Sequence, residues 1–238
     1  MANPYYDSGG QRAIKVNALF DRIARRYDRV NDWQSLGLHR LWKRALLAEA
    51  RVRPGDAFLD LCCGTGDIAL GLARQGAQVT GLDFSEPMLE VARRRCAAAG
   101  IPGVSWVRGD TQHTPFPDGA FDGATIGYGL RNLADWPAGL AEMIRVLRPG
   151  GRLLILDFGK PSNRLWRTIY FAYLRWLVPH LGRWFCGDAD AYAYILESLD
   201  HYPAQAGVTL ELERRGCRNL RLRNFLGGAM SLHYAETA

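Results

Sequence analysis

Acidic residues flank a glycine-rich turn in the first half of the chain. The turn reads Asp60-Leu61-Cys62-Cys63-Gly64-Thr65-Gly66-Asp67 and follows a short apolar run. Glycines let the backbone approach a ligand closely at the mouth of a parallel sheet. Asp83 ends the next apolar run, and a carboxylate there can accept hydrogen bonds from both hydroxyls of a ribose. This spacing indicates a nucleoside-binding loop.

The charge of the turn bears on which ligand it binds. Residues 64–69 also fit the looser G-x-G-x-x-A pattern of dinucleotide-binding folds. A pyrophosphate would lie at the start of the following helix, where this sequence has Asp67. Asp60 and Asp67 would repel a dianion, so the turn favours S-adenosylmethionine, which has an ammonium, a sulfonium and no phosphate. The alternative is that Asp60 is only a buried, hydrogen-bonded carboxylate and Asp67 only starts a helix.

Strand-like and helical patterns alternate around this turn. Strands are expected at 57–61, 78–82, 104–107, 123–126 and 153–156, and helices at 67–75, 85–99 and 138–147. Ser85 is the expected N-cap of the second helix, and residues 148–151 are expected to form a tight turn before the fifth strand. A final helix at 204–215 and a hairpin at 219–225 and 229–234 should close the chain. This order predicts an α/β fold with an open, mostly parallel sheet.

Composition limits the class of protein. Of the 238 residues, 48% are hydrophobic and 23% charged, which is typical of a globular protein and excludes a disordered, collagen-like or disulfide-rich chain. The net charge of +6 favours an anionic surface without establishing nucleic-acid binding. Five cysteines without a C-x-x-C pair predict a reduced, cytoplasmic protein with no metal site. Residues 1–20 carry no apolar signal region.

The order of motifs over residues 50–157 resembles the class I S-adenosylmethionine-dependent methyltransferases. Gly109-Asp110-Thr111 follows the third strand, where a carboxylate can reach the amine of an adenine, and Arg148-Pro149-Gly150-Gly151 precedes the fifth. The resemblance implies a Rossmann-like fold, S-adenosylmethionine as co-substrate and no metal. The donor would be bound by Asp60, Gly64, Thr65, Gly66, Asp83, Asp110, Thr111 and Gly127.

Segments outside this core resemble the ubiquinone/menaquinone biosynthesis C-methyltransferases, the UbiE/MenG family. The matching segments are Tyr27-Asp28-Arg29-Val30-Asn31 with Ser35, His39 and Trp42, then 127–132, 145–157, Tyr192, Tyr194, Leu196, Ser198 and 227–233. Val30 replaces the usual Met, and Asp157-Phe158-Gly159 replaces the usual Glu-x-Ser. The turn at 62–67 and Gly81-Leu82-Asp83-Phe84-Ser85 look most like the cyanobacterial and plastid branch, which methylates demethylphylloquinone.

The family resemblance implies methyl transfer to a ring carbon of a prenylated quinol. Arg131 would favour the phenolate and Asn132 would orient a ring oxygen; alternatively, Arg131 pairs with an acid such as Asp28. His39 is the candidate base, although its spacing from Trp42 on one helical face suits a packed histidine equally well. Four further residues are expected at the substrate or in a lid: Tyr27, Asp28, Asn31 and Tyr128. Tyr27 and Asp28 could instead hold the amino-terminal helices together.

We therefore expect one methyltransferase domain over residues 1–238. Its parts would be a helical lid (1–50), a donor-binding core (51–158), a helical insert for substrate or membrane (159–203) and the closing helix and hairpin (204–238). The insert interleaves aromatic residues with Arg164, Arg167, Arg175 and Arg183, which is typical of an element lying on anionic lipid. A buried aromatic helix pair or a homodimer interface is the alternative.

Other functional classes fit less well. A small-molecule methyltransferase acting on a sterol, phenol or amine would not need the Tyr27-Asp28 signature. A membrane adaptor with an inactive donor fold would not need Asp60, Gly64, Gly66 and Asp83. A nucleic-acid methyltransferase suits the basic charge, but no Asn/Asp-Pro-Pro-aromatic motif follows the fourth strand.

Overall fold

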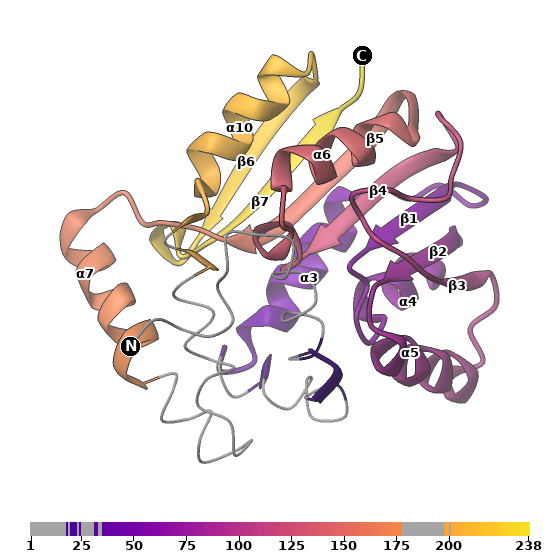
Figure 1. Ribbon diagram of the computed structural model, residues 1–238, viewed down its shortest axis with the longest axis horizontal. Coiled ribbons are helices and arrows are strands. Elements are labelled where there is room, and N and C mark those ends of the chain that lie inside the picture. Colours follow the sequence, from indigo (N-terminus) through magenta and orange to yellow (C-terminus); the bar gives the residue numbers. More distant parts are fainter. Residues whose placement is uncertain are drawn as a thin grey trace.

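A seven-stranded sheet organises the chain (Figure 1). The computed structural model describes residues 18, 20–22, 24, 31–32, 35–177, 198–199 and 201–238. The strands lie in the order β3-β2-β1-β4-β5-β7-β6, in which β7 runs antiparallel to its neighbours β5 and β6 and the pairs among β1 to β5 are parallel. Their bounds are β1 (Ala57–Leu61), β2 (Gln78–Asp83), β3 (Val104–Arg108), β4 (Phe121–Gly127), β5 (Leu147–Phe158), β6 (Arg218–Phe225) and β7 (Met230–Glu236).

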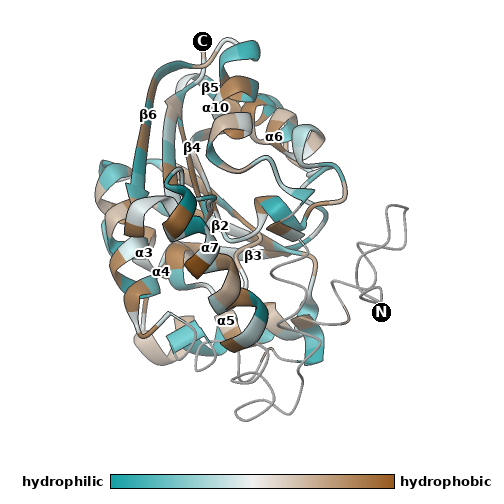
Figure 2. Cartoon of the chain, turned by 90° about the vertical axis from the view of Figure 1, so that its left-hand side faces the viewer, coloured by the Kyte–Doolittle hydropathy of each residue, from teal (hydrophilic) through white to brown (hydrophobic). Residues whose placement is uncertain are grey.

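Helices cover both faces of the sheet (Figure 2). The helices α3 (Leu38–Glu49) and α4 (Asp67–Ala73) bury Trp42, Leu46 and Leu72 against one face. The helices α6 (Trp136–Arg145) and α10 (Ala204–Arg214) bury Leu140, Met143 and Val208 against the other. Two apolar clusters sandwich the sheet, so the central strands are apolar on both faces.

Most expected elements are present, and several boundaries coincide. The strand at 57–61 and the closing hairpin are confirmed. In α5 (Glu86–Ala99), Ser85 is the N-cap, its Oγ accepts a hydrogen bond from the Met88 N–H, and a proline lies in the first turn. α6 starts two residues before the expected 138 because the Asp135 carboxylate caps the Ala138 N–H.

The expectation of a tight turn at 148–151 is wrong. These residues belong to the long strand β5, which pairs with β4 at Leu147 and again from Arg152, with an irregularity between. The reason is a distant partner, because Thr237 near the chain end pairs with this segment. Gly150 donates to the Thr237 carbonyl at 3.1 Å, and the Thr237 N–H donates to Gly151 O at 3.0 Å.

The segments flanking the core are described only in part. Residues 20–22 and 31–32 are helical, while Tyr27, Asp28, Tyr192, Tyr194 and Leu196 lie outside the described residues. Of the insert, the structure describes residues 159–177, which include α7 (Arg164–Ala172) and one π-helical turn η3 (Tyr173–Leu177), together with residues 198–199 and 201–203. No helix in the described part of the chain is long and apolar enough to cross a membrane.

Candidate active site

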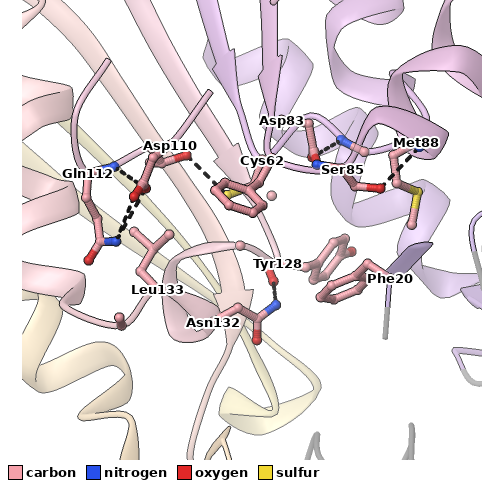
Figure 3. A pocket seen from close by; sticks show the side chains of 16 residues that line it. Phe20, Cys62, Asp83, Ser85, Met88, Asp110, Gln112, Tyr128, Asn132 and Leu133 are labelled. Carbon is pink, nitrogen blue, oxygen red and sulfur yellow. Dashed lines mark hydrogen bonds between the residues drawn. The ribbon is translucent and has the colours of Figure 1, made fainter. Parts of the chain in front are cut away.

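A cavity opens at the carboxyl ends of β1, β2 and β4, where the sequence placed the site (Figure 3). The described residues that line it come from the β1 loop, the end of β2 and start of α5, the segment after β3, the loop after β4, and the amino-terminal segment. They are Phe20, Cys62, Gly64, Asp83, Phe84, Ser85, Met88, Asp110, Thr111, Gln112, Gly127, Tyr128, Gly129, Asn132, Leu133 and Ala134. Open α/β sheets bind ligands at this edge.

The β1 loop needs its glycines. Gly64 and Gly66 have φ of +54° and +84°, a region that residues with a Cβ rarely adopt. At Gly66 an added Cβ would also lie 2.6 Å from the Trp106 ring. Cys62 adopts φ +50°, and non-glycine residues in this region concentrate at functional sites.

Asp83 is the carboxylate that the structure presents to the cavity from β2. Its Oδ2 accepts the Gly64 N–H at 2.8 Å and its Oδ1 accepts the Ser85 N–H at 2.9 Å. Each oxygen keeps a lone pair for a further donor. Burial raises the pKa of this carboxyl, and the two backbone donors act in the opposite direction.

Asp110 supplies a second carboxylate on another side of the cavity, beyond β3 (Figure 3). Its Oδ1 accepts the Gln112 N–H at 2.9 Å, and the Gln112 side-chain amide donates to it at 3.3 Å. Thr111 is buried, with its Oγ1 3.4 Å from Cys62 Sγ. Gln112 was not expected from the sequence, although it follows Asp110 closely enough to hold its side chain.

Asp60 does not line the cavity, which corrects the idea that its charge faces a ligand. The residue is 1% exposed. Its Oδ1 accepts the Thr125 hydroxyl at 2.7 Å and its Oδ2 accepts the Ala69 N–H at 3.0 Å. Burial raises its pKa to about 7. Asp60 thus joins β1, β4 and α4 behind the loop.

Asp67 is also turned away from the cavity, between two cations. Its Oδ2 accepts the Lys43 ammonium at 2.7 Å, and its Oδ1 accepts the Arg95 guanidinium. Although burial acts in the opposite direction, Lys43 and Arg95 lower its pKa to about 2. Thr65 is buried beside it and does not line the cavity. The negative lining therefore comes from Asp83 and Asp110, not from the pair that the sequence suggested.

The loop after β4 brings Gly127, Tyr128 and Asn132 to the cavity. A Cβ on Gly127 would lie 2.5 Å from Ile68 Cδ1, so only glycine fits without displacement. Tyr128 has φ +63°, and its carbonyl accepts the Asn132 side-chain N–H at 3.1 Å. The Asn132 Oδ1 accepts Arg131 Nη1 at 2.7 Å, which fixes which end of the amide is the acceptor.

Arg131 lies behind Asn132 and does not line the cavity. Its Nε is 3.2 Å from Asp157 Oδ1, its backbone N–H donates to Oδ2 of the same residue at 3.1 Å, and Nη1 donates to Ser198 Oγ at 2.7 Å. Arg131 and Asp157 are both buried. The acid beside Arg131 is thus Asp157; Asp28 lies outside the described residues.

His39 is packed in α3 and does not line the cavity. It shares a buried face with Trp42, as the spacing indicated. Its Nδ1 is 2.8 Å from Ser35 Oγ, and that hydroxyl donates to the Asn31 carbonyl at 2.6 Å. Burial lowers the pKa of His39, and Lys43 lowers it further. Asn31 supports this turn and does not line the cavity.

Sequence reasoning missed the contributions of Phe20, Met88 and Leu133, and gave Ser85 only a capping role. Phe20 reaches the cavity from the amino-terminal segment (Figure 3). Ser85 Oγ also donates to Asp21, next to Phe20, so this segment is attached to the end of β2. No local pattern in the sequence could predict that Ser85 bonds to Asp21, which lies 64 positions earlier. The position of Ser85 two residues after Asp83, however, could have predicted that Ser85 lies at the cavity.

The charges of the residues that line the cavity indicate which nucleoside-containing ligand fits. Two carboxylates line the cavity, and no lysine or arginine does so among the described residues. Phosphate groups need donors and positive charge, and the start of α4 carries Asp67 instead. An adenosyl donor with an ammonium and a sulfonium fits this lining, with Asp83 as acceptor for the ribose hydroxyls. No cluster of three metal-ligating side chains occurs in the described ranges.

The sheet order and this cavity define a class I S-adenosylmethionine-dependent methyltransferase. A solved S-adenosylmethionine-dependent methyltransferase from Aquifex aeolicus superposes with a TM-score of 0.59 over 82% of this chain and 89% of its own, at 19% identity. At that identity the likeness supports the fold alone.

The chain belongs to the ubiE/COQ5 methyltransferase family, whose profile matches residues 8–237. A 2-phytyl-1,4-naphtoquinone methyltransferase from Trichormus variabilis is 47% identical over 223 residues, covering 91% of this chain and 97% of its own. A demethylmenaquinone methyltransferase from Mycobacterium sp. (strain KMS) is 42% identical over 221 residues, 93% of each chain. The chain is therefore a member of a family of S-adenosylmethionine-dependent methyltransferases.

Proposed function

We propose that this protein methylates demethylphylloquinol, a 2-phytyl naphthoquinol, at a ring carbon to give phylloquinol. The observation that carries the proposal is the 47% identity to the Trichormus variabilis protein, together with the Cys62 turn and Asp83-Phe84-Ser85 segment that line the cavity. The 42% identity to the mycobacterial protein favours demethylmenaquinol as the second candidate. Other quinols of the ubiquinone or plastoquinone type are further alternatives.

The acceptor must be reduced for the chemistry to proceed. A quinone ring is electron-poor, whereas a quinol phenolate places electron density on the ring carbon. That carbon forms a bond to the methyl group, the sulfur–methyl bond breaks, and its electron pair stays on a neutral thioether. The ring proton at the same carbon then leaves to solvent. Holding the two reactants at attack distance can contribute about 7–11 kcal/mol.

Asn132 is proposed to contact the acceptor, with Arg131 positioning it. The Asn132 amide is held at both ends, by Arg131 Nη1 and by the Tyr128 carbonyl. A phenol has a pKa near 10, so a group that stabilises the phenolate lowers the barrier to its formation. Arg131→Ala should reduce turnover far more than donor affinity, and unchanged turnover would remove Arg131 from the mechanism. His39 as a proton acceptor and Tyr27, Asp28, Asn31 and Tyr128 at the substrate or lid stay proposals of the same kind.

The direct test offers the enzyme four acceptors with labelled S-adenosylmethionine: a phytyl naphthoquinone, a prenylated benzoquinone, and the reduced form of each. The proposal predicts product from the naphthoquinol, much less from the benzoquinol, and none from either quinone. Equal turnover of both quinols would contradict the preference for a naphthoquinol and would leave only methylation of a quinol ring. Turnover of the quinones would contradict the chemistry.

Access of a lipid-tailed acceptor suggests a membrane-facing surface, which we place on α7 and η3. Leu165, Ile169 and Trp176 are 72%, 50% and 68% exposed, and Arg164, Arg167 and Arg175 lie on the same two elements. Apolar side chains interleaved with arginines suit an anionic lipid surface.

Flotation with anionic liposomes at low salt tests this placement. The protein should float, and Trp176→Ser with Ile169→Ser should reduce flotation, while Leu210→Ser on α10, also exposed, should not. An absence of flotation at low salt excludes the membrane surface, and a concentration-dependent dimer that the α7 variants disrupt would assign this face to a homodimer instead.

A further inference from the structure

Three consecutive arginines on α5, residues 93–95, have different partners. Arg93 pairs with Glu86 and Arg94 with Glu90, both on the same exposed helix surface. Arg95 instead reaches back to the loop between β1 and α4. Its Nη1 donates to the Thr65 carbonyl and to Thr65 Oγ1, each at 3.0 Å, and Nη2 donates to Asp67.

The loop that Arg95 holds is conformationally demanding. Cys62, Gly64 and Gly66 all have positive φ, so three of five consecutive residues lie in the left-handed region. The loop is tied down at its carboxyl-terminal part by Arg95 and at Gly64 by the Asp83 side chain. Gly64 and Asp83 line the cavity, whereas Arg95 does not.

Lys43 and Arg95 both pair with Asp67, but their other contacts differ. Its ammonium pairs with Asp67 Oδ2 and lies 5.8 Å from the centre of the Tyr128 ring. Arg95 bonds to both a carboxylate and a backbone carbonyl. A planar guanidinium can make such a bifurcated set of bonds, which a lysine ammonium cannot reproduce in the same geometry.

We propose that Arg95 is a positioning residue that sets the affinity of the enzyme for its methyl donor by fixing the 62–66 loop. The inference rests on the proposed donor site at Gly64 and Asp83. Without Arg95, the Thr65 carbonyl and the Asp67 carboxylate lose their shared partner, and the loop can leave the conformation that places Gly64 against Asp83. Steps after donor binding do not use Arg95.

The test compares Arg95→Gln, Arg95→Lys, Lys43→Gln and the matched control Arg94→Gln in the full chain. Calorimetry with S-adenosylhomocysteine gives the dissociation constant, and steady-state assays give KM for donor, KM for acceptor and kcat. Arg95→Gln should weaken binding and raise the donor KM about tenfold, as expected when a few charge-assisted hydrogen bonds are lost. The acceptor KM and kcat at saturating donor should change by less than about twofold, since both constants report steps that come after donor binding.

The pattern across variants identifies the cause. Arg95→Lys should recover part of the affinity, Lys43→Gln should cost less than Arg95→Gln, and Arg94→Gln should behave as the wild type. Thr65→Val removes the hydroxyl that accepts from Arg95 and keeps the charges of Arg95 and Asp67. This variant should lose less affinity for S-adenosylhomocysteine than Arg95→Gln. Wild-type affinity in Arg95→Gln, or equal losses in donor and acceptor KM, would overturn the inference.

A separate arm distinguishes this failure from failure of the proposed site. Asp83→Ala should weaken binding of S-adenosylhomocysteine about 100-fold whatever the role of Arg95. If Asp83→Ala binds as tightly as the wild type, the donor site is elsewhere and the inference falls with it. If Asp83→Ala binds weakly while Arg95→Gln binds as tightly as the wild type, the site stands and only the role of Arg95 is refuted.

Discussion

The two halves of the cavity edge satisfy their charged groups differently. At the ends of β2 and β3, Asp83 and Asp110 face the cavity and are oriented by backbone and amide donors. At the ends of β4 and β5, Arg131 and Asp157 neutralise each other behind the lining, and the side chains of Tyr128, Asn132 and Leu133 line the cavity.

This difference suits two kinds of ligand. Carboxylates that face the cavity recognise hydroxyls and cations, as an adenosyl donor requires. A lining of fixed amide and aromatic groups suits a flat, largely apolar ring, and a buried ion pair behind it holds the amide in one orientation. A buried pair is poor evidence of net stability, but breaking it is costly because one charge is left unpaired.

Breaking the ion pair should have the largest effect on stability. Asp157→Ala leaves Arg131 buried without its carboxylate, so the free energy of unfolding should fall by about 3–5 kcal/mol in urea denaturation. Replacing both residues, Arg131→Met with Asp157→Leu, should recover much of the loss. If the single and double variants are equally unstable, the charges are not the cause.

Removing the Asp83 carboxylate should act mainly on binding of the methyl donor. Asp83→Ala deletes both carboxylate oxygens at the cavity, so affinity for S-adenosylhomocysteine should fall about 100-fold. Asp83→Asn should lose less. The control is Asp118→Ala, whose carboxylate is 82% exposed on the surface, and comparable losses in both variants would contradict a local role for Asp83.

Asp60, which is buried behind the β1 loop, should make the stability of the protein depend on pH. Because its folded pKa is raised to about 7, above that of an unfolded aspartate near 4, the folded state holds one more proton in between. Stability from this group is therefore present at low pH and is lost as pH rises through that window. Asp60→Asn removes this titration, so its stability relative to the wild type should increase from pH 4 to pH 7 and level off above. A constant difference between the two proteins would show that Asp60 does not titrate there.

Local patterns in the sequence predicted the core of the fold well. Apolar runs bounded by glycine and by Ser85 predicted β1, α5 and the closing hairpin, because those signals act within a few residues. The prediction of a turn at 148–151 was wrong because Thr237, far along the chain, pairs with this segment. Long-range backbone partners leave no local signal.

The sequence predicted where the candidate site lies better than it predicted what each of its residues does. Gly64, Asp83, Asp110 and Gly127, which the sequence placed at or after strand ends, all line one cavity. Local spacing could not tell that Asp67 is held by Lys43 and Arg95, 24 and 28 residues away, or that Asp60 turns inward. Carboxylates that look alike in the sequence differ in function once their distant partners are known.

The most direct measurement is a crystal structure of the protein with S-adenosylhomocysteine. The account predicts the nucleoside in the cavity of Figure 3, with the ribose hydroxyls within hydrogen-bond distance of Asp83 and the thioether beside Gly127 and Tyr128. The compound bound elsewhere, or a phosphate-bearing dinucleotide occupying that cavity in its place, would contradict it.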